Sequence, residues 1–429
     1  MKKALFSALS ACLLAACGGP RNASLTFELA STSSQPQTDA QFVLTRADLR
    51  PVTDATLPVV KQADGQLVPT QLDDMDGDGA WDEMAFVYSL GAGEKANVQV
   101  DWVAADAYPS FPARTNVHLG KKLPGQPVQD MQTDVIYGAA LPWNPYPYQT
   151  DGPSWENELA GFRHYFDGRH SRDFFGKKTK AMVMDQVGIR PDGTIGDTYH
   201  VMADWGRDIL SCANSFGLGG LALYRQDTLI RFGVLQYEPQ GVMDSTRFTL
   251  ISKGPVRGIF TLDHHGWNVG DARIDVRQTV VIWAGRYGYE NRVEAKGIPA
   301  DAQLVTGLVT SRNSQPYYRT QYDGAVDALM THDMQSYEKD FWFGMCVMVP
   351  SPYFAGDYDA PKEGRPGKDP GLIQTWCAKL NMPQGKATYH VFGVWGNGDP
   401  RFEDRQQFID AMAVEGDLIA HPASIREVK

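Results

Sequence analysis

Cysteine is scarce in this sequence. Of the 429 residues only 5 are cysteine, and Cys12 and Cys17 lie close to the N-terminus. The folded part is therefore left with Cys212, Cys346 and Cys377, and an odd number allows at most one disulfide within the chain. No pair has the short spacing of a zinc ribbon. We expect these three thiols to be small buried hydrophobic groups.

The chain also has fewer basic than acidic residues, and it lacks a complete dinucleotide-binding loop. Asp and Glu number 51 against 40 Lys and Arg, which gives a formal net charge of -11. Nucleic-acid-binding proteins usually have a basic face, so nucleic acid is not an expected partner. An anionic substrate remains compatible, because a few arginines can reverse the field in a cleft. The stretch "GLGG" at 217–220 lacks the third glycine of a dinucleotide loop.

Helical periodicity is missing from most of the chain, and alternation with a period of two takes its place. In "ARIDVRQTVVIW", Ile274, Val276, Val280 and Ile282 fall on one face, which predicts a half-buried strand. Similar stretches separated by glycine and proline predict a mainly β protein. The 10 Trp, 18 Tyr and 19 Phe fit sheet packing first and sugar stacking second. One helix is predicted near the end, in "RFEDRQQFIDAMAVEG", with Gly416 as its stop.

The N-terminus, "MKKALFSALSACLLAAC", has a basic start, a short apolar run and a final cysteine. The run is too short to span a bilayer, and the pattern is typical of a secretory signal peptide. Its end resembles a bacterial lipobox, so we expect cleavage before Cys17 and lipidation of Cys17. An ordinary signal peptide with a chance cysteine is the alternative. Because Gly18 follows, the resemblance to Gram-negative lipoproteins favours an outer-membrane lipoprotein that faces the periplasm or the surface.

The composition divides the rest of the chain into four parts. Residues 18–24 read as a tether, and 25–105 as a small β domain. Residues 106–154 are rich in proline and tyrosine and read as a connection. Residues 155–429 are expected to form one large β domain that carries the active site.

An acidic loop lies within the small domain. In "DDMDGDGAWDE", calcium-loop spacing is shown by Asp74, Asp76, Asp78 and Asp82. The twelfth position of an EF-hand, where a glutamate is needed, is Ala85, so a complete EF-hand is ruled out. A structural calcium loop of another type is one interpretation. A hairpin turn whose carboxylates accept from backbone N–H groups is the other.

Two segments concentrate groups that suit catalysis. In "SWENELAGFRHYFDGRHSRDFFGKKTK", a strand would put His164 on the packed face and Arg163 on the opposite, open face. In "GDTYHVMADWGRDIL", His200 and Asp204 are four residues apart and would face the same way on a helix or a strand. Asp204 can then orient the imidazole. A turn in which the aspartates cap backbone groups is the alternative.

In chain order, "WENELAGFR", "FFGKKTK", "YHVMADWGRDIL" and "NSFGLGGLAL" resemble the bacterial DUF4861 family, as does "DMDGDGAWDE". The resemblance covers about 25 to 425. It implies secreted or lipidated proteins of polysaccharide-utilisation gene clusters, and dehydration of a terminal uronic acid on an oligosaccharide such as those of ulvan. It also implies a β-supersandwich related to galactose mutarotase. The chain departs from the family at Glu158 and Leu159, which puts substrate choice in doubt.

Loss of water across C4 and C5 of a uronate requires three groups. Arg163, supported by Lys177 or Lys178, would neutralise the carboxylate. His200 with Asp204 would remove the C5 proton, and Tyr199 or Glu156 would protonate the leaving hydroxyl. Further substrate-binding candidates are Asn157, His164, Trp205, His265 and His332, with 143–148 as a stacking surface.

Three alternatives remain open at this point. A catalytic divalent metal held by His200, Asp204 and Glu156 can replace the arginine. The same elimination can cleave a glycosidic bond, which would make the protein a polysaccharide lyase. The aromatic content and the expected lipid anchor also suit a non-catalytic glycan-binding lipoprotein. The expected partners are a uronate-containing oligosaccharide and, through Cys17, a membrane.

Overall fold

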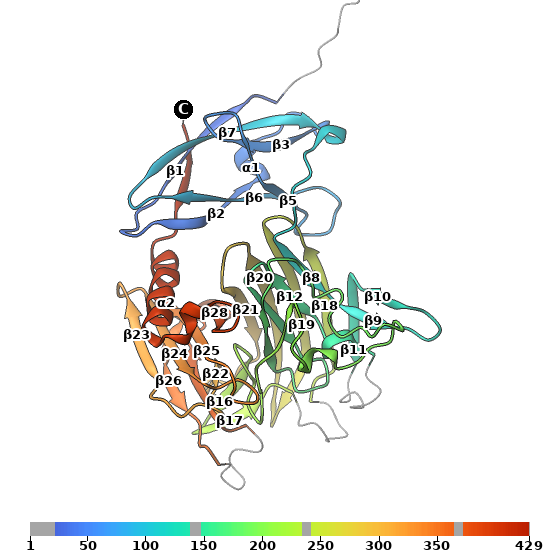
Figure 1. Ribbon diagram of the computed structural model, residues 1–429, viewed down its shortest axis with the longest axis vertical. Helices are drawn as coiled ribbons and strands as arrows, with labels where there is room; N and C mark the ends of the chain where they lie inside the picture. Colours follow the sequence, from blue (N-terminus) through green and yellow to red (C-terminus); the bar gives the residue numbers. More distant parts are fainter. Residues whose placement is uncertain (1–21, 138–146, 234–241, 364–371, 429) are drawn as a thin grey trace, which may run out of the picture.

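A computed structural model (Figure 1) describes residues 22–137, 147–233, 242–363 and 372–428. The predicted fold class is confirmed, because the chain is mainly β, with a large sandwich, a small N-terminal β unit and a C-terminal helix. The three free cysteines are buried, as expected. Within the described ranges, no helix is long and apolar enough to cross a membrane. Cys17, Trp143 and the tether up to 21 lie outside these ranges.

The sandwich is built on one antiparallel sheet of nine strands. In spatial order the strands are β11 (Thr133–Tyr137), β18 (Ser245–Ser252), β19 (Arg257–Val269), β20 (Ala272–Trp283), β21 (Gly288–Lys296), β28 (Lys386–Trp395), β25 (Phe343–Pro350), β24 (Val326–Asp333) and β23 (Tyr318–Tyr322). The predicted alternation holds in β20, where Ile274, Val276, Val280 and Ile282 are all buried in the core.

Two five-stranded sheets cover the core side of the nine-stranded sheet. The β8–β15 sheet contains, in order, β15 (Gly206–Asp208), β14 (Arg172–Lys177), β13 (Ala160–His164), β12 (Ser154–Asn157) and β8 (Thr115–His118). The β16–β27 sheet contains β17 (Thr228–Arg231), β16 (Ala222–Arg225), β22 (Ala302–Val309), β27 (Thr375–Leu380) and β26 (Phe354–Asp359). A single apolar core joins all three sheets. Trp155 of β12, for example, lies 5.1 Å from Phe260 of β19 between ring centroids.

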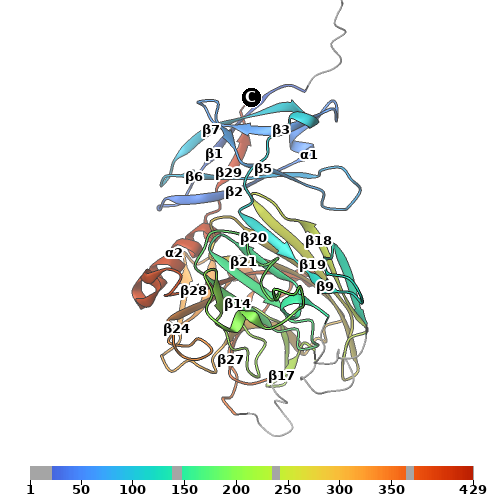
Figure 2. The ribbon, with the colours of Figure 1, turned by 45° about the vertical axis from the view of Figure 1, so that its right-hand side comes forward.

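The N-terminal unit consists of two further sheets with their own core. One contains β29 (Ser424–Glu427), β1 (Leu25–Ala30), β7 (Lys95–Ala104), β3 (Thr56–Lys61) and β4 (Leu67–Val68). The other contains β2 (Gln37–Thr45), β6 (Glu83–Leu90) and β5 (Thr70–Asp73). Figure 2 shows this unit lying across one end of the sandwich.

The two domains do not divide at residue 155 as predicted, because segments from each side of this boundary pair with strands on the other side. The last strand, β29, leaves the sandwich and pairs with β1 of the N-terminal unit. The segment 106–154 is also more than a connection, because β8 lies within it and pairs with β12. It further contains the small pair β9 (Gly120–Lys122) and β10 (Val128–Asp130) and the short turn η2 (Gln149–Asp151), and the turn η1 (Ala105–Ala107) leads into it.

Helices are few. The long one is α2 (Arg405–Ala420), and its N-cap Asp404 accepts from the backbone N–H of Gln407. Gly416 lies inside α2 and does not end it, contrary to the prediction. A Cβ at Gly416 would collide with the ring of Tyr322 in β23, so the glycine is a close-approach residue. The remaining short elements are α1 (Arg46–Leu49), η3 (Thr198–His200), η4 (Ser351–Tyr353), η5 (Pro383–Gly385) and η6 (Pro400–Glu403).

Candidate functional site

A buried arginine occupies the outer face of the β8–β15 sheet. Arg163 lies directly opposite Asp173 in the register of β13 and β14, so their side chains share a face. The Arg163 side chain is 2% exposed, and its Nη2 lies 2.6 Å from Asp173 Oδ2 and 2.7 Å from Asp208 Oδ2. Nη1 lies 3.3 Å from Asp151 Oδ2, and the Tyr165 hydroxyl accepts from Nη2. We call these five residues the Arg163 cluster.

The Arg163 cluster contains more carboxylates than cations. Burial lowers the pKa of Arg163, but Tyr165, Asp173 and Asp208 outweigh it and hold that pKa well above its usual value. Burial and the charge of Asp173 raise the pKa of Asp208 well above that of an ordinary aspartate, against the opposing effect of Arg163. Burial likewise raises the pKa of Asp151. The cluster therefore retains protons to higher pH than exposed carboxylates would.

The short turn η3 places a tyrosine and a histidine beside this cluster. The Tyr199 ring covers the Arg163 guanidinium, with 4.9 Å from Cζ to the ring centroid. Its hydroxyl lies 3.2 Å from Asp151 Oδ2 and 3.1 Å from Asp197 Oδ1. Tyr199 is only 2% exposed, whereas 51% of the His200 side chain is exposed. The turn thus buries one group and leaves its neighbour open to solvent.

The carboxylate beside His200 is not the predicted one. His200 Nδ1 lies 3.7 Å from Asp208 Oδ2, whereas Asp204 is exposed and forms no ion pair with His200 in the structure as described. The i, i+4 argument fails because no helix or strand spans both residues. The turn η3 ends at His200, and β15 begins only at Gly206. The prediction that Asp204 orients His200 is therefore wrong.

Glu156 and Lys177 form a buried ion pair instead of facing a substrate. Their side chains are 0% and 1% exposed. Glu156 Oε1 accepts from the backbone N–H groups of Val183 (2.6 Å) and Met184 (2.7 Å). Lys177 Nζ also donates to the carbonyls of Asn157 and Ala181. The pair ties the segment after β14 onto the sheet, so the predicted roles of Glu156 as acid or metal ligand and of Lys177 as carboxylate partner do not fit.

Asn157 is equally occupied within the protein. Its Nδ2 donates to the carbonyls of Trp283 (2.7 Å) and Arg286 (2.6 Å). Its Oδ1 accepts from the backbone N–H groups of Leu159 and Ala160. With both amide hydrogens and the carbonyl oxygen engaged, Asn157 joins two sheets and does not act as the predicted sugar ligand.

Three histidines gather on the opposite, core face of β13. His164 Nε2 lies 3.1 Å from His170 Nδ1, and the ring centroids of His170 and His264 lie 5.1 Å apart. Burial lowers the pKa of all three, and that of His170 falls to about 4. The predicted alternation of His164 and Arg163 is correct, but it separates His164 from the candidate site.

Two other predicted histidines lie elsewhere. His265 is exposed on β19 and lies 3.8 Å from Asp275. His332 is sandwiched between the rings of Trp342 and Phe408 and bonds to the carbonyl of Phe402. Neither belongs to the Arg163 cluster, so the substrate-binding roles predicted for both are not supported by their positions.

Trp205 does lie at the site, because it packs on Phe175, which also contacts Tyr199.

The chain matches one protein family over almost its whole length. The family model described as "Domain of unknown function (DUF4861)" matches residues 29–425. The chain belongs to the DUF4861 family. No curated protein matches it. Among solved structures, an alpha-mannosidase from Enterococcus faecalis V583 is similar to this DUF4861 chain with a TM-score of 0.45 and 10% identity. The match covers 95% of this chain and 46% of the mannosidase, so the DUF4861 chain spans less than half of that protein.

This DUF4861 protein also contains a buried polar network that the sequence argument missed. Arg172 Nη1 bonds to the Tyr289 hydroxyl (3.0 Å), and Nη2 donates to Gln278 Oε1 (2.8 Å). Asn291 Nδ2 donates to the same Gln278 oxygen and bonds to the Tyr389 hydroxyl. All five are buried, on the core side of the sheets.

The signal for this network is present in the sequence. Gln278 interrupts the apolar row of β20 between Val276 and Val280, and Asn291 does the same in β21 between Tyr289 and Val293. A polar residue at an inward position of a strand indicates a partner in the core. Both hydroxyls of the network also reach the "GLGG" loop, at the carbonyls of 218 and 219.

Lys178 is the one predicted cation with a free charge. It is exposed and forms no ion pair with any residue that the structure describes. It lines a cavity of about 360 Å³ together with Lys180, Tyr287, Trp395 and Arg401. Glu158 and Asp399 also line this cavity, and Arg401 is paired with Asp399, so among the described residues the unpaired positive charge there comes from Lys178 and Lys180.

The acidic loop of the DUF4861 chain brings three of its four aspartates together. Oxygens of Asp74, Asp76 and Asp78 lie within 4.8 Å of one another. Asp82 points elsewhere, and its Oδ2 accepts from the backbone N–H of Met75. Asp74 accepts from the N–H of Gly79, which is the main reason why its pKa is lowered. The loop thus has the backbone hydrogen bonds expected of a hairpin turn. It also has the grouped carboxylate oxygens expected of a calcium loop.

Proposed function

We propose that this protein is a carbohydrate-active dehydratase. It eliminates water across C4 and C5 of a non-reducing-end uronic acid on a polysaccharide-derived oligosaccharide and leaves an unsaturated uronyl end. The observation that carries the proposal is the pair formed by Tyr199 and His200 beside Arg163. One member keeps its proton and the other stays neutral, and elimination needs such an acid and base side by side. The implied activity of DUF4861 members supports the same reaction.

His200 is the base in this proposal. Burial, together with the charge of Arg163, lowers its pKa below 6.5, so the imidazole is neutral at pH 7. With the proton on Nδ1, toward Asp208, Nε2 keeps a lone pair that can accept the C5 proton. The electrons of the broken C5–H bond then form the C4–C5 double bond.

The acid is the hydrogen-bonded pair of Tyr199 and Asp151. Burial raises the pKa of both groups, which favours their protonated forms. Asp151, whose side chain is 30% exposed, is the accessible end of the pair. It passes a proton to the departing 4-hydroxyl, which leaves as water as the C4–O bond breaks.

The substrate carboxylate requires positive charge, and Arg163 does not supply it directly. Its guanidinium is surrounded by three aspartates and Tyr165. We assign Arg163 to positioning Asp208 and Tyr199. We assign carboxylate binding to Lys178, the exposed cation of the predicted set, whose backbone N–H donates to the carbonyl of Trp205 (2.7 Å) beside the cluster. The metal alternative does not use the predicted ligands, since Glu156 is paired with Lys177, and His200 lies beside Asp208 and not beside Asp204.

The test is mass spectrometry of a panel of uronate-ended oligosaccharides after incubation with the protein. We expect a product lighter by one water molecule, with the ultraviolet absorbance of an unsaturated uronate and an unchanged number of sugar units. His200→Ala should abolish it, and the matched control His265→Ala, another exposed histidine, should not. Two shorter fragments would identify a lyase, and no product from any substrate would refute the proposal.

Two further assignments complete it. We propose that Asp74, Asp76 and Asp78 bind a structural calcium ion. Calcium should then raise the melting temperature of the protein but not that of Asp76→Asn/Asp78→Asn, and an equal response would contradict the assignment.

We also propose that Cys17 carries a lipid and anchors the protein in a Gram-negative outer membrane. Detergent partitioning lost in Cys17→Ser is the expected result.

A further inference from the structure

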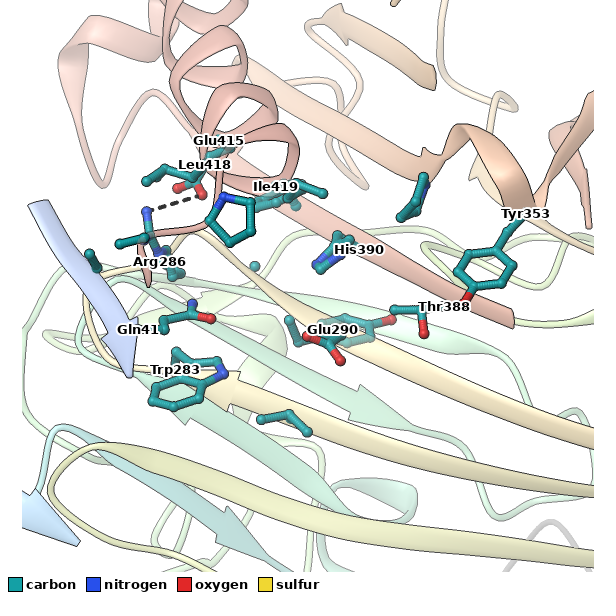
Figure 3. Close-up of a pocket in the computed structure, with 18 residues that line it drawn as sticks. Gln41, Trp283, Arg286, Glu290, Tyr353, Thr388, His390, Glu415, Leu418 and Ile419 are labelled. Carbon is teal, nitrogen blue, oxygen red and sulfur yellow. Dashed lines mark hydrogen bonds and ion pairs between the residues drawn. The ribbon is translucent and has the colours of Figure 1, made fainter. Parts of the chain in front are cut away.

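A second cavity lies between β2, the outer face of the nine-stranded sheet and α2 (Figure 3). Its volume is about 360 Å³, which is within the range of ligand pockets. Among its lining side chains are Gln41, Trp283, Glu290, Tyr353, Thr388 and His390. The Arg163 cluster belongs to a different sheet, so this cavity is separate from the candidate active site.

The cavity wall contains polar groups whose hydrogen-bonding capacity is unused. Glu290 lies opposite His390 in the register of β21 and β28, and Thr388 is two residues before His390, so the three share the outer face. Within the described ranges, the side chains of Gln41, Tyr353, Thr388 and His390 form no hydrogen bond with the protein. A cavity with several unpaired donors and acceptors suits a ligand rich in hydroxyl groups.

The charges around the cavity are already balanced. Glu290 is paired with Arg292, and Arg286 Nη1 lies 3.4 Å from Glu415 Oε2 (Figure 3). Burial lowers the pKa of His390, so its ring is neutral at pH 7 and offers one donor and one acceptor. An anionic ligand would find no free cation there. The electrostatics therefore favour an uncharged ligand.

Apolar groups supply the rest of the wall. Trp283 lies on the side of β20, Phe392 on β28 and Ile419 on α2. Apolar and aromatic surfaces next to hydrogen-bonding groups match the two kinds of surface of a sugar ring. We propose that this cavity binds a neutral sugar unit of a glycan, at a site distinct from the one that carries out the elimination.

The test is isothermal titration calorimetry of the whole protein with neutral mono- and disaccharides, and with glucuronate as the charged probe. We expect saturable binding of a neutral sugar and weaker binding of glucuronate. Thr388→Trp should reduce the affinity at least tenfold, because the indole fills the cavity. Thr279→Trp, on the same outer face but outside the cavity, is the matched control and should bind like the wild type.

His200→Ala separates this inference from the proposed function, because it should keep neutral-sugar binding while losing dehydration. If Thr388→Trp fails to fold, Gln41→Ala at the cavity wall should still weaken binding. The proposal is overturned if no neutral sugar binds, if glucuronate binds more tightly, if binding survives Thr388→Trp, or if binding disappears in His200→Ala.

Discussion

The Arg163 guanidinium lies beneath Tyr199 and between the carboxylates of Asp173 and Asp208. Replacing it by methionine keeps the volume but leaves these carboxylates buried without a counter-charge. We expect Arg163→Met to lower the free energy of unfolding by about 3–5 kcal/mol, measured by urea denaturation. Arg312→Met, at an exposed arginine with no ion pair to the described residues, should change it by less than about 0.5 kcal/mol. Equal stability of the two variants would contradict this account of Arg163.

Asp208 and Asp204 provide a test variant and a matched control for the role of His200 as the base. Asp208 lies next to His200, and Asp204 does not. We expect Asp208→Asn to reduce kcat/KM about 100-fold or more, the usual scale for impaired general-base catalysis. Asp204→Asn should leave kcat/KM nearly unchanged. A larger loss in Asp204→Asn than in Asp208→Asn would instead identify Asp204 as the residue that orients His200.

The pH dependence of the reaction tests His200 itself. Since the His200 pKa is lowered, wild-type activity should persist below pH 6.5 and fall only in more acidic solution.

The sequence allowed some of these residues to be placed and not others. Strand alternation correctly put Arg163 and His164 on opposite faces, because that depends only on local geometry. The partner of His200 depends on where η3 ends and β15 begins, and alternation says nothing about either. Alternation therefore gave no reason to prefer Asp208 to Asp204 as that partner. The core network at Gln278 went unnoticed although its polar side chain interrupts an apolar row.

At the scale of single elements, α2 contains a glycine that a helix would normally avoid. Alanine is favoured over glycine in a helix by about 1 kcal/mol, but a Cβ at Gly416 would meet the Tyr322 ring. We expect Gly416→Ala to destabilise the protein by about 1–3 kcal/mol in urea denaturation. In a Tyr322→Leu background the same change should be neutral or stabilising. Destabilisation in both backgrounds would show that the ring is not the cause.

The prediction of α2 was also limited by contacts that local sequence rules do not reveal. Its existence followed from helix formers and the spacing of Phe408 and Met412, which the structure buries. The position of its end did not follow, because the rule that glycine often comes just after the last turn of a helix takes no account of tertiary packing. Close packing on β23 makes Gly416 a contact residue, and only the tertiary structure reveals that contact.

At the scale of the whole molecule, the buried histidines link stability to pH. His170 has a folded-state pKa of about 4, below the ordinary value of 6.5. Between these values the unfolded chain binds a proton that the folded protein does not, so stability is complete above pH 6.5 and declines as the pH falls toward 4. The loss from His170 is on the order of 3 kcal/mol. Urea denaturation at several pH values should show a weaker decline for His170→Asn, and parallel curves would refute the assignment.

The mainly β class and the supersandwich were predictable from alternation, composition and the family motifs, and the structure confirms them. The position of β29 could not be predicted from the sequence. It is four residues long, and its partner β1 lies almost 400 residues earlier in the chain. Short strands carry little periodic signal, and no local rule links such distant segments.

The pairing of β1 with β29 has a practical consequence for engineering the protein. Phe27 lies opposite Glu427, and the N–H of Val428 donates to the carbonyl of Thr26 (2.8 Å), so the two ends of the described chain run side by side. A short peptide would join them without disturbing the sheet to which both strands belong. The chain then becomes a closed ring that can be reopened at an exposed turn, such as Gly324, to give a circular permutant with the same fold.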